Sequence, residues 1–565
     1  MRMLGQLRAV AGILPRVFVR RELQRFLAAT RDCRETQRET LNRLLWLNQE
    51  SRFSADHRLS TGLTPQQFRE RIPITTYDDY APYIQQMLNG DHRALLGTNN
   101  PLLMFSLSSG TTQKSKYIPI TLQFLKDYKR GWQNWGIRTL DEYPAIHALH
   151  ILQLSSSHDR FRTPGGTPCG NISGLVASMQ KRIVQTMYTV TGDVARIESP
   201  EAKQYTALRL ALADEDVGMV ITANPSTLVH LARKTEEHLE DLTRDIADGT
   251  LSEKFEIPNS VRKNLKPRTS KKNRKRARFL EQLIDKTGHC YPRDYWPNLQ
   301  VVGVWTGGSA GAYLNSLRTY YGDVPVRDHG LHASEGRMTI PLQGGSPQGV
   351  LDVCSHYFEF IPEEEFDSQS PTVLEAHEVE PGRNYYILMS TSSGFCRYNI
   401  CDVVRCTGYY ETTPMFEFLH KGAHISNLTG EKISESQVVA AVREAINGMP
   451  MELSQFTVAP VWGEIPKYQL LVEQKDFPSL DFADQFARKV DSKLKAINCE
   501  YREKRETGRL AEMGVIALPA GTWEEFTRCR QQGLGGSLEQ YKHPCLIPDL
   551  EFADKMIREY SETVA

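Results

Sequence analysis

Short apolar runs that alternate with helical stretches, from about residue 101 onward, constrain the fold of this chain most strongly. The runs end in Gly, Ser, Thr or Pro, and they include HALHILQL, DVGMVITAN, LQVVGVWTGG, NYYILMSTS and DVVRCTGYY. A short apolar run closed by turn residues is typical of a buried strand, and strands that alternate with helices form α/β folds. We therefore expect an α/β protein with mixed sheets.

The length of the chain indicates more than one domain. A chain of 565 residues exceeds what one hydrophobic core normally supports, and 40% hydrophobic residues are enough to fill sizeable cores. After about residue 420, the segments SESQVVAAVREAI, YQLLVEQ and FADQFARKVDSKLKAI predict a helix, a strand and a second helix. We expect a large N-terminal domain over residues 1–420 and a smaller C-terminal domain over residues 421–565.

Charge and cysteine content argue against several classes of protein. Lys plus Arg equal Asp plus Glu at 68 each, so net charge creates no overall attraction to nucleic acid or to an anionic membrane. The ten cysteines include no CxxC pair, which argues against a disulfide framework or a zinc ribbon. Cys396, Cys401 and Cys406 would face alternating sides of a strand, so we expect buried thiols there and no metal site.

The N-terminal residues 1–50 predict a helical lead-in. Arginines flank a short apolar run, but Pro15 and Arg16 interrupt it, and no stretch approaches the ~18 to 20 apolar residues of a membrane span. We expect an amphipathic helix that packs on the body of the protein. The alternatives are an interfacial helix that contacts a membrane peripherally and a cleaved signal peptide. We expect a cytoplasmic protein that is monomeric by default.

A strongly basic segment lies within a predicted helical insertion over residues 228–290. The basic residues concentrate in residues 262–278, which could suggest nucleic-acid binding. The run lacks interleaved aromatic residues for base stacking, and no DNA-binding motif surrounds it. We therefore expect a solvated helix whose arginine stems lie on apolar surface, and no specific nucleic-acid partner.

Small residues gather in several candidate ligand-binding turns. In FSLSSGTTQKSKYIP, residues 105–119, a turn of Ser, Gly and Thr could aim backbone N–H groups and hydroxyls at phosphate oxygens, with Lys114 or Lys116 adding positive charge. It is not a Walker A loop, because GxxxxGK[ST] is absent. WTGGSAGAY, residues 305–313, follows an apolar run, which is where α/β sheets place ligands. By itself, the first of these segments is more often a plain turn, and the second is equally consistent with a tight connection from strand to helix.

Charged residues accompany three further turns. Glu335 follows Ser334 in DHGLHASEG, where a carboxylate could hold Mg²⁺ beside nucleotide phosphates, although such an acid is more often a cap or a surface residue. Asp402, in YNICD, could accept hydrogen bonds from ribose hydroxyls or end a turn at a strand start. Lys432 lies in a TGEKIS turn before a helix capped by Ser434 or Ser436.

The order of these segments resembles the adenylate-forming enzymes. SSGTTQKSKYIP, HASEG and RYNICD resemble the three nucleotide motifs of the plant GH3 acyl-acid amido synthetases and their bacterial relatives. TPGGTPCGNISGLVAS, ANPSTLVHLAR, TGGSAGAY and LGGSLEQYKHP strengthen the match to this family, which covers roughly residues 60–550. The chain is identified as a member of the GH3 family.

The resemblance implies ATP and Mg²⁺ as cofactors, bound between a large N-terminal domain and a mobile C-terminal cap domain. It implies that Glu335 reaches Mg²⁺, that Asp402 holds the ribose, and that Lys432 and Lys542 bring positive charge from the C-terminal domain. The remaining expected nucleotide-binding residues are Ser108, Ser109, Gly110, Thr111, Thr112, Gly308, Ser309 and Ser334, of which Gly308 and Ser309 would line the adenine or acyl site.

The chain departs from the family pattern at three places. Leu331 and His332 stand where the plant motif has an aromatic residue before the Ser-Glu pair. Cys401 replaces the glycine of the plant glycine-aspartate pair, which could narrow the ribose site. Pro544 precedes Cys545 where the family often has Pro-Arg, so one expected cation is missing.

The implied reaction is ATP-dependent adenylation of a carboxylic acid, followed by amide formation with an amino acid or another amine. Positioning and electrostatic stabilisation would do most of this work, and no side-chain nucleophile is required. His332 could serve as a base for the amine, or it could be a structural histidine. Two alternatives remain open, a ligase that transfers the acyl group to a thiol such as coenzyme A and a catalytically silent scaffold.

The sequence does not identify the acid or the amine. Aromatic and apolar residues around Trp132, Trp135 and Leu175 are candidates for the acyl pocket, although core packing explains them equally well.

Overall fold

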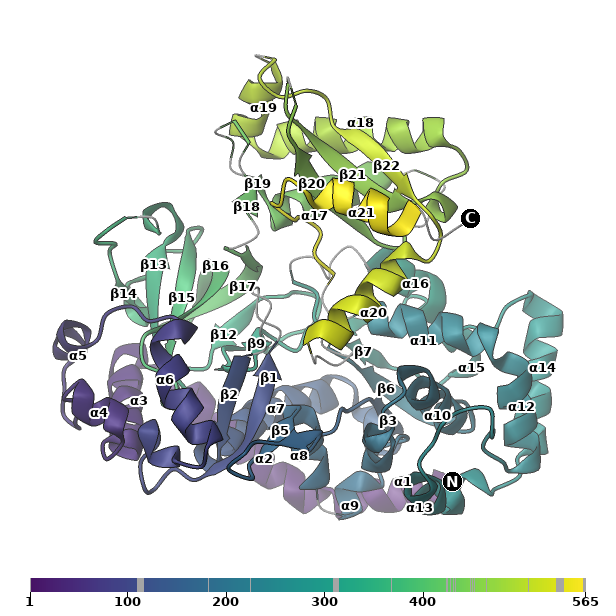
Figure 1. Cartoon of the computed structure of the whole chain (residues 1–565). Coiled ribbons are helices and arrows are strands. Elements are labelled where there is room, and N and C mark those ends of the chain that lie inside the picture. The colour runs from purple at the N-terminus through teal and green to yellow at the C-terminus, as the bar shows by residue number, and fades with distance from the viewer. Residues whose placement is uncertain are drawn as a thin grey trace.

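The computed structural model of the chain has a large N-terminal part and a smaller C-terminal unit that sits against it (Figure 1). No helix of the described part of the chain is both long and apolar enough to cross a bilayer. The structure describes residues 2–108, 116–180, 182–223, 225–307, 314–366, 368–422, 425–426, 428–429, 431, 433–447, 449, 451, 453–463, 465–506, 508–534 and 543–561.

Helices form the N-terminal segment. The second of them, α2, buries Leu23 and Phe26 in a small core with Ile137, Ile340 and Val350, so it packs on the body of the protein. The first turns of α2 are not buried in this way, since Leu14 and Phe18 are largely exposed. The helices are α1 (Arg2–Ala11), α2 (Ile13–Ala29), α3 (Cys33–Asn48), α4 (Arg52–Asp56), α5 (Pro65–Arg71) and α6 (Tyr77–Leu88).

Helix α3 is anchored to strands that come more than 300 residues later. Asp32 caps its first turn by accepting a hydrogen bond from the Glu35 N–H. The Gln37 amide group donates to the carbonyls of Val353 and His356, both at 2.8 Å, and its carbonyl oxygen accepts from the Phe358 N–H. A buried amide with every partner supplied by backbone fixes the position of the helix.

An antiparallel sheet of order β11-β12-β17-β16-β15-β13-β14 packs against these helices. The run DVVRCTGYY is confirmed as strand, but the strand begins at Tyr398, so the interpretation of Asp402 as a residue at a strand start is wrong. The strands are β11 (Thr339–Ile340), β12 (Gly349–Leu351), β13 (Tyr357–Pro362), β14 (Leu374–Glu375), β15 (Asn384–Ser390), β16 (Tyr398–Tyr410) and β17 (Thr413–Lys421).

A buried carboxylate ties this sheet to the N-terminal helices. Glu359 of β13 accepts hydrogen bonds from Arg69 Nε at 2.7 Å and from Arg397 Nε at 3.0 Å, and its side chain is 1% exposed. Arg397 has a φ of 50°, a left-handed conformation that is strained for a residue with a side chain. Because Arg397 directly precedes β16, this ion cluster fixes where that strand begins.

A parallel sheet of order β3-β6-β7-β8 forms the second half of the large part. Alternate residues of its strands face opposite sides, as in any strand. Leu152, Val220 and Val302 face a core built by the helices that follow, whereas Ile151 and Met219 face α7. The strands are β3 (His150–Gln153), β6 (Val217–Ile221), β7 (Val301–Gly303) and β8 (Val326–Arg327), and the long helix is α7 (Leu122–Glu142).

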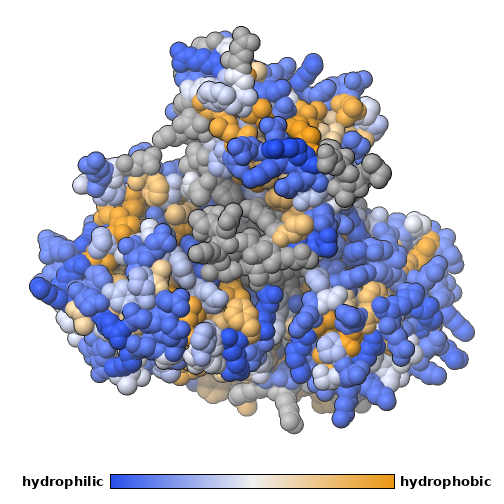
Figure 2. Space-filling model, viewed as in Figure 1, coloured by the Kyte–Doolittle hydropathy of each residue, from blue (hydrophilic) through white to orange (hydrophobic). Residues whose placement is uncertain are grey.

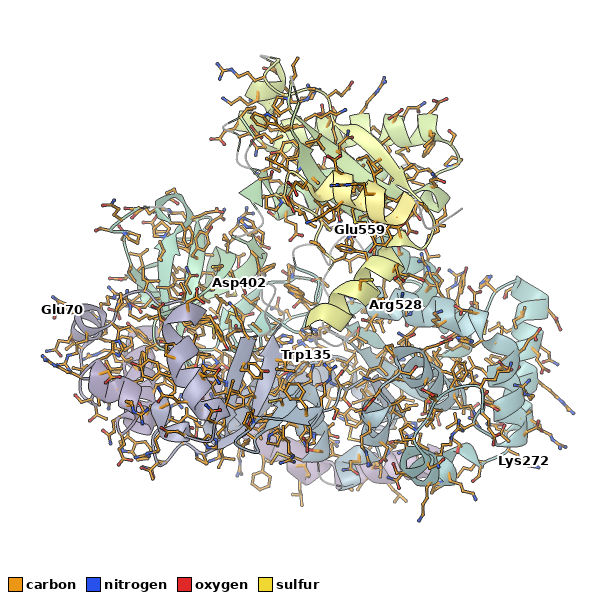
Figure 3. The ribbon with its side chains drawn as sticks, viewed as in Figure 1. Glu70, Trp135, Lys272, Asp402, Arg528 and Glu559 are labelled. Carbon is orange, nitrogen blue, oxygen red and sulfur yellow. The ribbon has the colours of Figure 1, made fainter. Side chains whose placement is uncertain are left out.

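Helices cover the face of this sheet that carries Leu152, Val220 and Val302, and two of them contain most of the basic run of residues 262–278. Arg262 and Arg276 point their guanidinium groups at backbone carbonyls of neighbouring segments, which holds these arginines within the fold. Lys272 lies at the periphery, far from Asp402 (Figure 3). These helices are α10 (Pro200–Leu212), α11 (Pro225–Glu237), α12 (Leu239–Asp248), α13 (Asn259–Thr269), α14 (Arg274–Thr287), α15 (Pro292–Tyr295) and α16 (Leu314–Tyr321).

A small mixed sheet and a hairpin lie between the two larger sheets. The mixed sheet has the order β2-β1-β5-β4, with parallel β1–β5 pairing and antiparallel β1–β2 and β4–β5 pairing. The elements are β1 (Leu102–Ser108), β2 (Lys116–Thr121), β4 (Phe161–Arg162), β5 (Pro168–Gly170), α8 (Ile172–Ser178), α9 (Arg182–Gln185), β9 (His332–Ala333) and β10 (Gly336–Arg337).

The C-terminal unit has its own hydrophobic core. The predicted helix, strand and second helix are confirmed as α17, β21 and α18, and Ser434 caps α17 in a capping box with Gln437. The boundary at residue 420 stays a prediction. The elements are β18 (Ile425–Ser426), β19 (Ile433–Ser434), α17 (Glu435–Ile446), β20 (Phe456–Val461), β21 (Lys467–Glu473), α18 (Leu480–Ile497), α19 (Cys499–Glu506), β22 (Gly514–Leu518), α20 (Thr522–Leu534) and α21 (Phe552–Ser561).

Candidate active site

A cavity of about 1880 Å³ runs between the large part and the C-terminal unit. Its wall includes Lys116, Glu335 and Asp402 from the large part, and Glu435 and His543 from the C-terminal unit. The volume is about twice the upper end of the ~300 to 1000 Å³ range of common ligand pockets. The cavity therefore has room for a nucleotide together with a second molecule.

Asp402 and Lys421 form an ion pair in this wall. The two residues are backbone partners in the β16–β17 ladder, and Lys421 Nζ donates to Asp402 Oδ1 at 2.7 Å and to the Ile400 carbonyl at 3.1 Å. The Asp402 side chain is 5% exposed, whereas that of Lys421 is 41% exposed. Burial acts to lower the pKa of Lys421, but the carboxylates of Asp402 and Glu335 outweigh it and raise that pKa.

Cys401 adopts a backbone conformation that favours glycine. Its φ is 59°, and its N–H donates to Asn399 Oδ1 at 2.8 Å while its carbonyl accepts from the Gly422 N–H at 2.7 Å. A left-handed residue with a Cβ costs roughly 1 to 2 kcal/mol relative to glycine. A glycine would adopt this conformation without that cost, whereas Cys401 adds a side chain to the cavity wall.

Glu335 lies at the turn of the β9–β10 hairpin, together with Ser334. Glu335 is 6% exposed and lines the cavity with Ser334. Burial raises the pKa of Glu335, and the positive charges of Lys421 and Lys116 oppose that shift. The negative charge of Asp402 acts in the same direction as burial, so the Glu335 carboxylate has charges of both signs near it.

The side chains near Glu335 fit Mg²⁺ that is bound together with a nucleotide better than a metal ion held by protein ligands alone. The described residues contain no group of three or more His, Cys, Asp and Glu side chains that could hold a metal ion. Mg²⁺ usually binds one or two carboxylates and takes its other ligands from water and substrate phosphates. One buried carboxylate, that of Glu335, is therefore consistent with Mg²⁺ carried in with a nucleotide.

Lys116 marks the end of the turn rich in Ser, Gly and Thr. It is the first residue of β2 and the backbone partner of Ser108, the last residue of β1. Lys116 Nζ donates to the Tyr398 hydroxyl at 3.4 Å and lies 5.4 Å from the centroid of the Tyr77 ring. Of the two lysines considered for this turn, the structure describes Lys116 and places it in the cavity wall.

Aromatic residues form another part of the wall. Trp132 and Trp135 of α7 both line the cavity, whereas Leu175 is buried in a core with Ile172 and does not. The ring centroids of His329 and His332 lie 5.5 and 5.8 Å from that of Trp132. His332 Nδ1 lies 3.0 Å from the Gly330 carbonyl, an arrangement in which Nδ1 carries the proton. Its use as a base stays a prediction.

The buried Arg337 side chain packs against the Trp132 ring. It is 1% exposed, and its guanidinium carbon lies 4.4 Å from the Trp132 ring centroid, within the range of a cation–π contact. A Cβ on Gly131 would lie 2.3 Å from Arg337 Cδ, so α7 has space for glycine alone at that position. Burial lowers the pKa of Arg337 to about 10.

Asp328 joins two of the candidate turns. Its carboxylate accepts from the Thr306 N–H at 2.6 Å and hydroxyl at 2.7 Å, and from the Gly330 N–H at 2.6 Å. Burial raises the pKa of Asp328 to about 6, although these hydrogen bonds oppose the shift. Thr306 lies just before the Gly-Gly-Ser sequence and Gly330 lies five residues before Glu335, so one buried side chain joins the backbone at these two places.

Substitution of Asp328 by Asn is expected to lower the free energy of unfolding by about 1 to 3 kcal/mol. The amide NH₂ would face N–H donors and leave buried donors without an acceptor. Urea unfolding followed by tryptophan fluorescence measures the loss. Asp323→Asn, an exposed residue five positions earlier, is the control and should leave the unfolding midpoint unchanged. Equal midpoints for the two variants would refute the linking role of Asp328.

The structure brings Ser334, Glu335 and Asp402 together in one cavity wall. For Ser108 it describes the backbone, as the end of β1. Figure 3 shows Asp402 and Trp135 in the middle of the molecule, below the C-terminal unit. The other expected site residues lie outside the described residues: Ser109, Gly110, Thr111, Thr112, Gly308, Ser309, Lys432 and Lys542.

Three residues of the site were missed by sequence reasoning. Lys421 becomes a partner of Asp402 through strand pairing, and Arg337 reaches Trp132 through tertiary packing; no local pattern indicates either contact. Asp328 carried a weak signal, because an aspartate two residues before a glycine often accepts a backbone hydrogen bond in a turn.

Family models match most of the chain. The GH3 family N-terminal domain matches residues 22–326, the GH3 family central domain residues 349–421 and the GH3 family C-terminal domain residues 436–551. The central match ends at Lys421, the last residue of β17.

Sequence alignments with named relatives cover nearly the whole chain. A jasmonoyl–L-amino acid synthetase GH3.5 of Oryza sativa subsp. japonica is 28% identical over 560 residues, covering 93% of this chain and 94% of the relative. An indole-3-acetic acid-amido synthetase GH3.3 of Arabidopsis thaliana is 24% identical over 559 residues, covering 94% of this chain and 92% of the relative.

A solved structure shares the fold. The chain matches a GH3.15 acyl acid amido synthetase with a TM-score of 0.82 at 20% identity, over 95% of this chain and 96% of the other. The expected α/β fold, with a large N-terminal part and a smaller C-terminal unit, is confirmed.

Proposed function

This chain belongs to the GH3 family, and on that premise we propose that it is an ATP-dependent acyl-acid amido synthetase. It is a ligase that forms a carbon–nitrogen bond between a carboxylic acid and an amino acid or another amine. Relatives named as jasmonoyl- and indole-3-acetic acid-amido synthetases over more than nine-tenths of the chain support this activity. The observation that carries the proposal is a single cavity that joins Asp402, Lys421 and Glu335 to the C-terminal unit.

The reaction has two steps. In the first, a carboxylate oxygen of the acid attacks the α-phosphorus of ATP, and the bond from that phosphorus to the pyrophosphate oxygen breaks. In the second, the amine nitrogen attacks the acyl carbon, AMP leaves with the electrons of the carbon–oxygen bond, and the nitrogen loses a proton. Both steps develop negative charge on phosphate oxygens, which fixed donors and cations stabilise.

We assign the roles of the described residues from their positions. Asp402 accepts hydrogen bonds from the ribose hydroxyls, and Lys421 orients the Asp402 carboxylate. Glu335 holds Mg²⁺, which when bound neutralises charge on the phosphates. Lys116 adds positive charge beside the phosphate turn.

The remaining roles follow from the family motifs. Ser108, Ser109, Gly110, Thr111 and Thr112 form the phosphate turn, Gly308 and Ser309 line the adenine or acyl site, and Ser334 accompanies Glu335. Lys432 and Lys542 supply cations from the C-terminal unit, which approaches the nucleotide by domain closure. A cytoplasmic location, a monomeric state and peripheral membrane contact by the N-terminal helices stay predictions.

Substitution of Lys421 by Met is expected to raise the KM for ATP about tenfold. Asp402 would lose its charge-assisted hydrogen bond, and a buried carboxylate without its partner orients the ribose poorly. Initial rates of pyrophosphate release against ATP concentration measure the change. Lys475→Met is the matched control, because Lys475 is 42% exposed and pairs with the buried Glu473 away from the cavity. A KM unchanged by Lys421→Met would refute the positioning role.

The activity is tested with purified full-length protein, ATP and Mg²⁺ across a panel of aromatic, indolic and aliphatic acids, with and without each amino acid. We expect acid-dependent pyrophosphate release and an amide detected by mass spectrometry. A product that forms only when coenzyme A is present would favour the thioester ligase. ATP binding without pyrophosphate release for any acid would favour the silent scaffold.

A further inference from the structure

The cavity extends well beyond the residues assigned to the nucleotide. One part of its wall, the apolar branch, is formed by α7 and by Ile151 and Met219 on the face of the parallel sheet that packs toward α7. Trp132, Trp135 and Met187 add further large apolar side chains to this part of the wall, and Gln153, two residues after Ile151 on β3, adds a polar one. The side chains on both walls of this branch are otherwise large and apolar, a surface that a hydrocarbon chain would fill.

The branch reaches the N-terminal helices at its outer end. Leu14 and Phe18 of α2 line the same cavity, yet they are 72% and 63% exposed. A side chain that lines a cavity and also contacts solvent lies at its mouth. The apolar first turns of α2 therefore continue the apolar wall outward from Trp132, on the side away from the C-terminal unit.

We propose that the acid substrate carries a long apolar chain, which lies along Trp132, Ile151 and Met219 and ends against Leu14 and Phe18. This inference rests on the proposed amido synthetase activity and specifies its substrate class. The carboxylate of the acid lies at the end of the cavity that holds Lys116 and Glu335. A short acid leaves the apolar branch unfilled and Leu14 and Phe18 open to solvent, whereas a long chain covers both.

Chain-length dependence tests the proposal on the full-length enzyme. Pyrophosphate release is measured with straight-chain acids from butanoate to hexadecanoate, below their micellar concentrations, with ATP, Mg²⁺ and hydroxylamine as the acceptor. We expect kcat/KM to rise about fourfold per added methylene over the middle of the series, the ratio that corresponds to burying one methylene group. A flat or falling series would overturn the proposal.

Substitutions at the mouth provide the matched comparison. Leu14→Asp and Phe18→Asp should each lower the ratio of kcat/KM for hexadecanoate over butanoate at least tenfold. Val10→Asp is the control, because Val10 is 66% exposed on the neighbouring helix α1 and does not line the cavity. An equal ratio in all three variants would contradict the assignment of α2 to the acyl site.

A binding measurement separates this inference from the proposed activity. The fluorescent acid cis-parinaric acid should bind the wild-type protein and Val10→Asp alike, and Leu14→Asp at least tenfold more weakly. Pyrophosphate release with aromatic acids but no binding of the probe would leave the activity standing and overturn the chain-length proposal. Probe binding without pyrophosphate release for any acid would support the long-chain acyl site and overturn the proposed activity.

Discussion

Replacement of Glu335 by Gln is expected to lower the rate of acid-dependent pyrophosphate release about 100- to 1000-fold, the usual cost of removing one preorganised electrostatic group. Glutamine keeps the shape of the side chain and removes its charge, so the hairpin turn between β9 and β10 can persist. The buried carboxylate at this position is the one that the proposed mechanism assigns to Mg²⁺. The measurement is the initial rate at saturating ATP across a Mg²⁺ titration.

The Mg²⁺ titration distinguishes a metal ligand from a merely structural residue. A lost ligand should move the half-saturating Mg²⁺ concentration upward as well as lowering the rate. Glu417→Gln is the control, since Glu417 lies in β17 and pairs with Arg405 outside the cavity. A Glu335 variant with a normal rate and normal Mg²⁺ dependence would exclude Glu335 from the catalytic site.

Replacement of Glu359 by Ala should have the largest effect on stability, lowering the free energy of unfolding of the large part by about 3 to 5 kcal/mol. Two arginines, Arg69 and Arg397, share this carboxylate, and removing it leaves positive charge without compensation in a site where the Arg397 side chain is 6% exposed. Urea unfolding followed by tryptophan fluorescence measures the loss. We also expect ATP binding to weaken, because Arg397 directly precedes the strand that carries Asp402.

An exposed ion pair from the same region is the reference for this experiment. Glu364 pairs with Arg383 at the surface, where their side chains are 59% and 42% exposed. Glu364→Ala should cost less than about 1 kcal/mol, as exposed pairs do. If Glu359→Ala cost no more than Glu364→Ala, the buried cluster would not hold the start of β16.

Much of the fold follows from local sequence, and the exceptions have physical causes. The apolar runs before Thr222 and before Trp305 are strands β6 and β7, because burial on both faces selects continuous apolar residues. The start of β16 was not predicted, since Asn399 and Asp402 have low strand propensity. Pairing with β15 and β17 overrides that propensity, and the left-handed Cys401 marks the strain.

The candidate site, like the fold, is predictable from local sequence only in part. Glu335 and Asp402 belong to recognisable motifs, and the cavity brings them together. Lys421 belongs to no recognisable motif, because its role arises from the β16–β17 strand register, which pairs it with Asp402, 19 positions earlier. The hydrophilic outer surface over α12 and α14, visible in Figure 2, agrees with the prediction of a solvated face for that helical region.

The anchoring of α3 also determines when the large part can be completed during synthesis. The backbone groups that hold Gln37 belong to residues 353–358, and the Cys33 N–H donates to Thr412 Oγ1, 379 residues later. At ~5 to 20 residues per second, the ribosome takes roughly 15 to 65 seconds to deliver the first of these partners. During that time the apolar face of α3, with Leu41, Leu44 and Leu45, has no strand to cover it. Helix α3 is therefore made more than 300 residues before the backbone groups that hold it in place, and its apolar face stays uncovered by them until they are made.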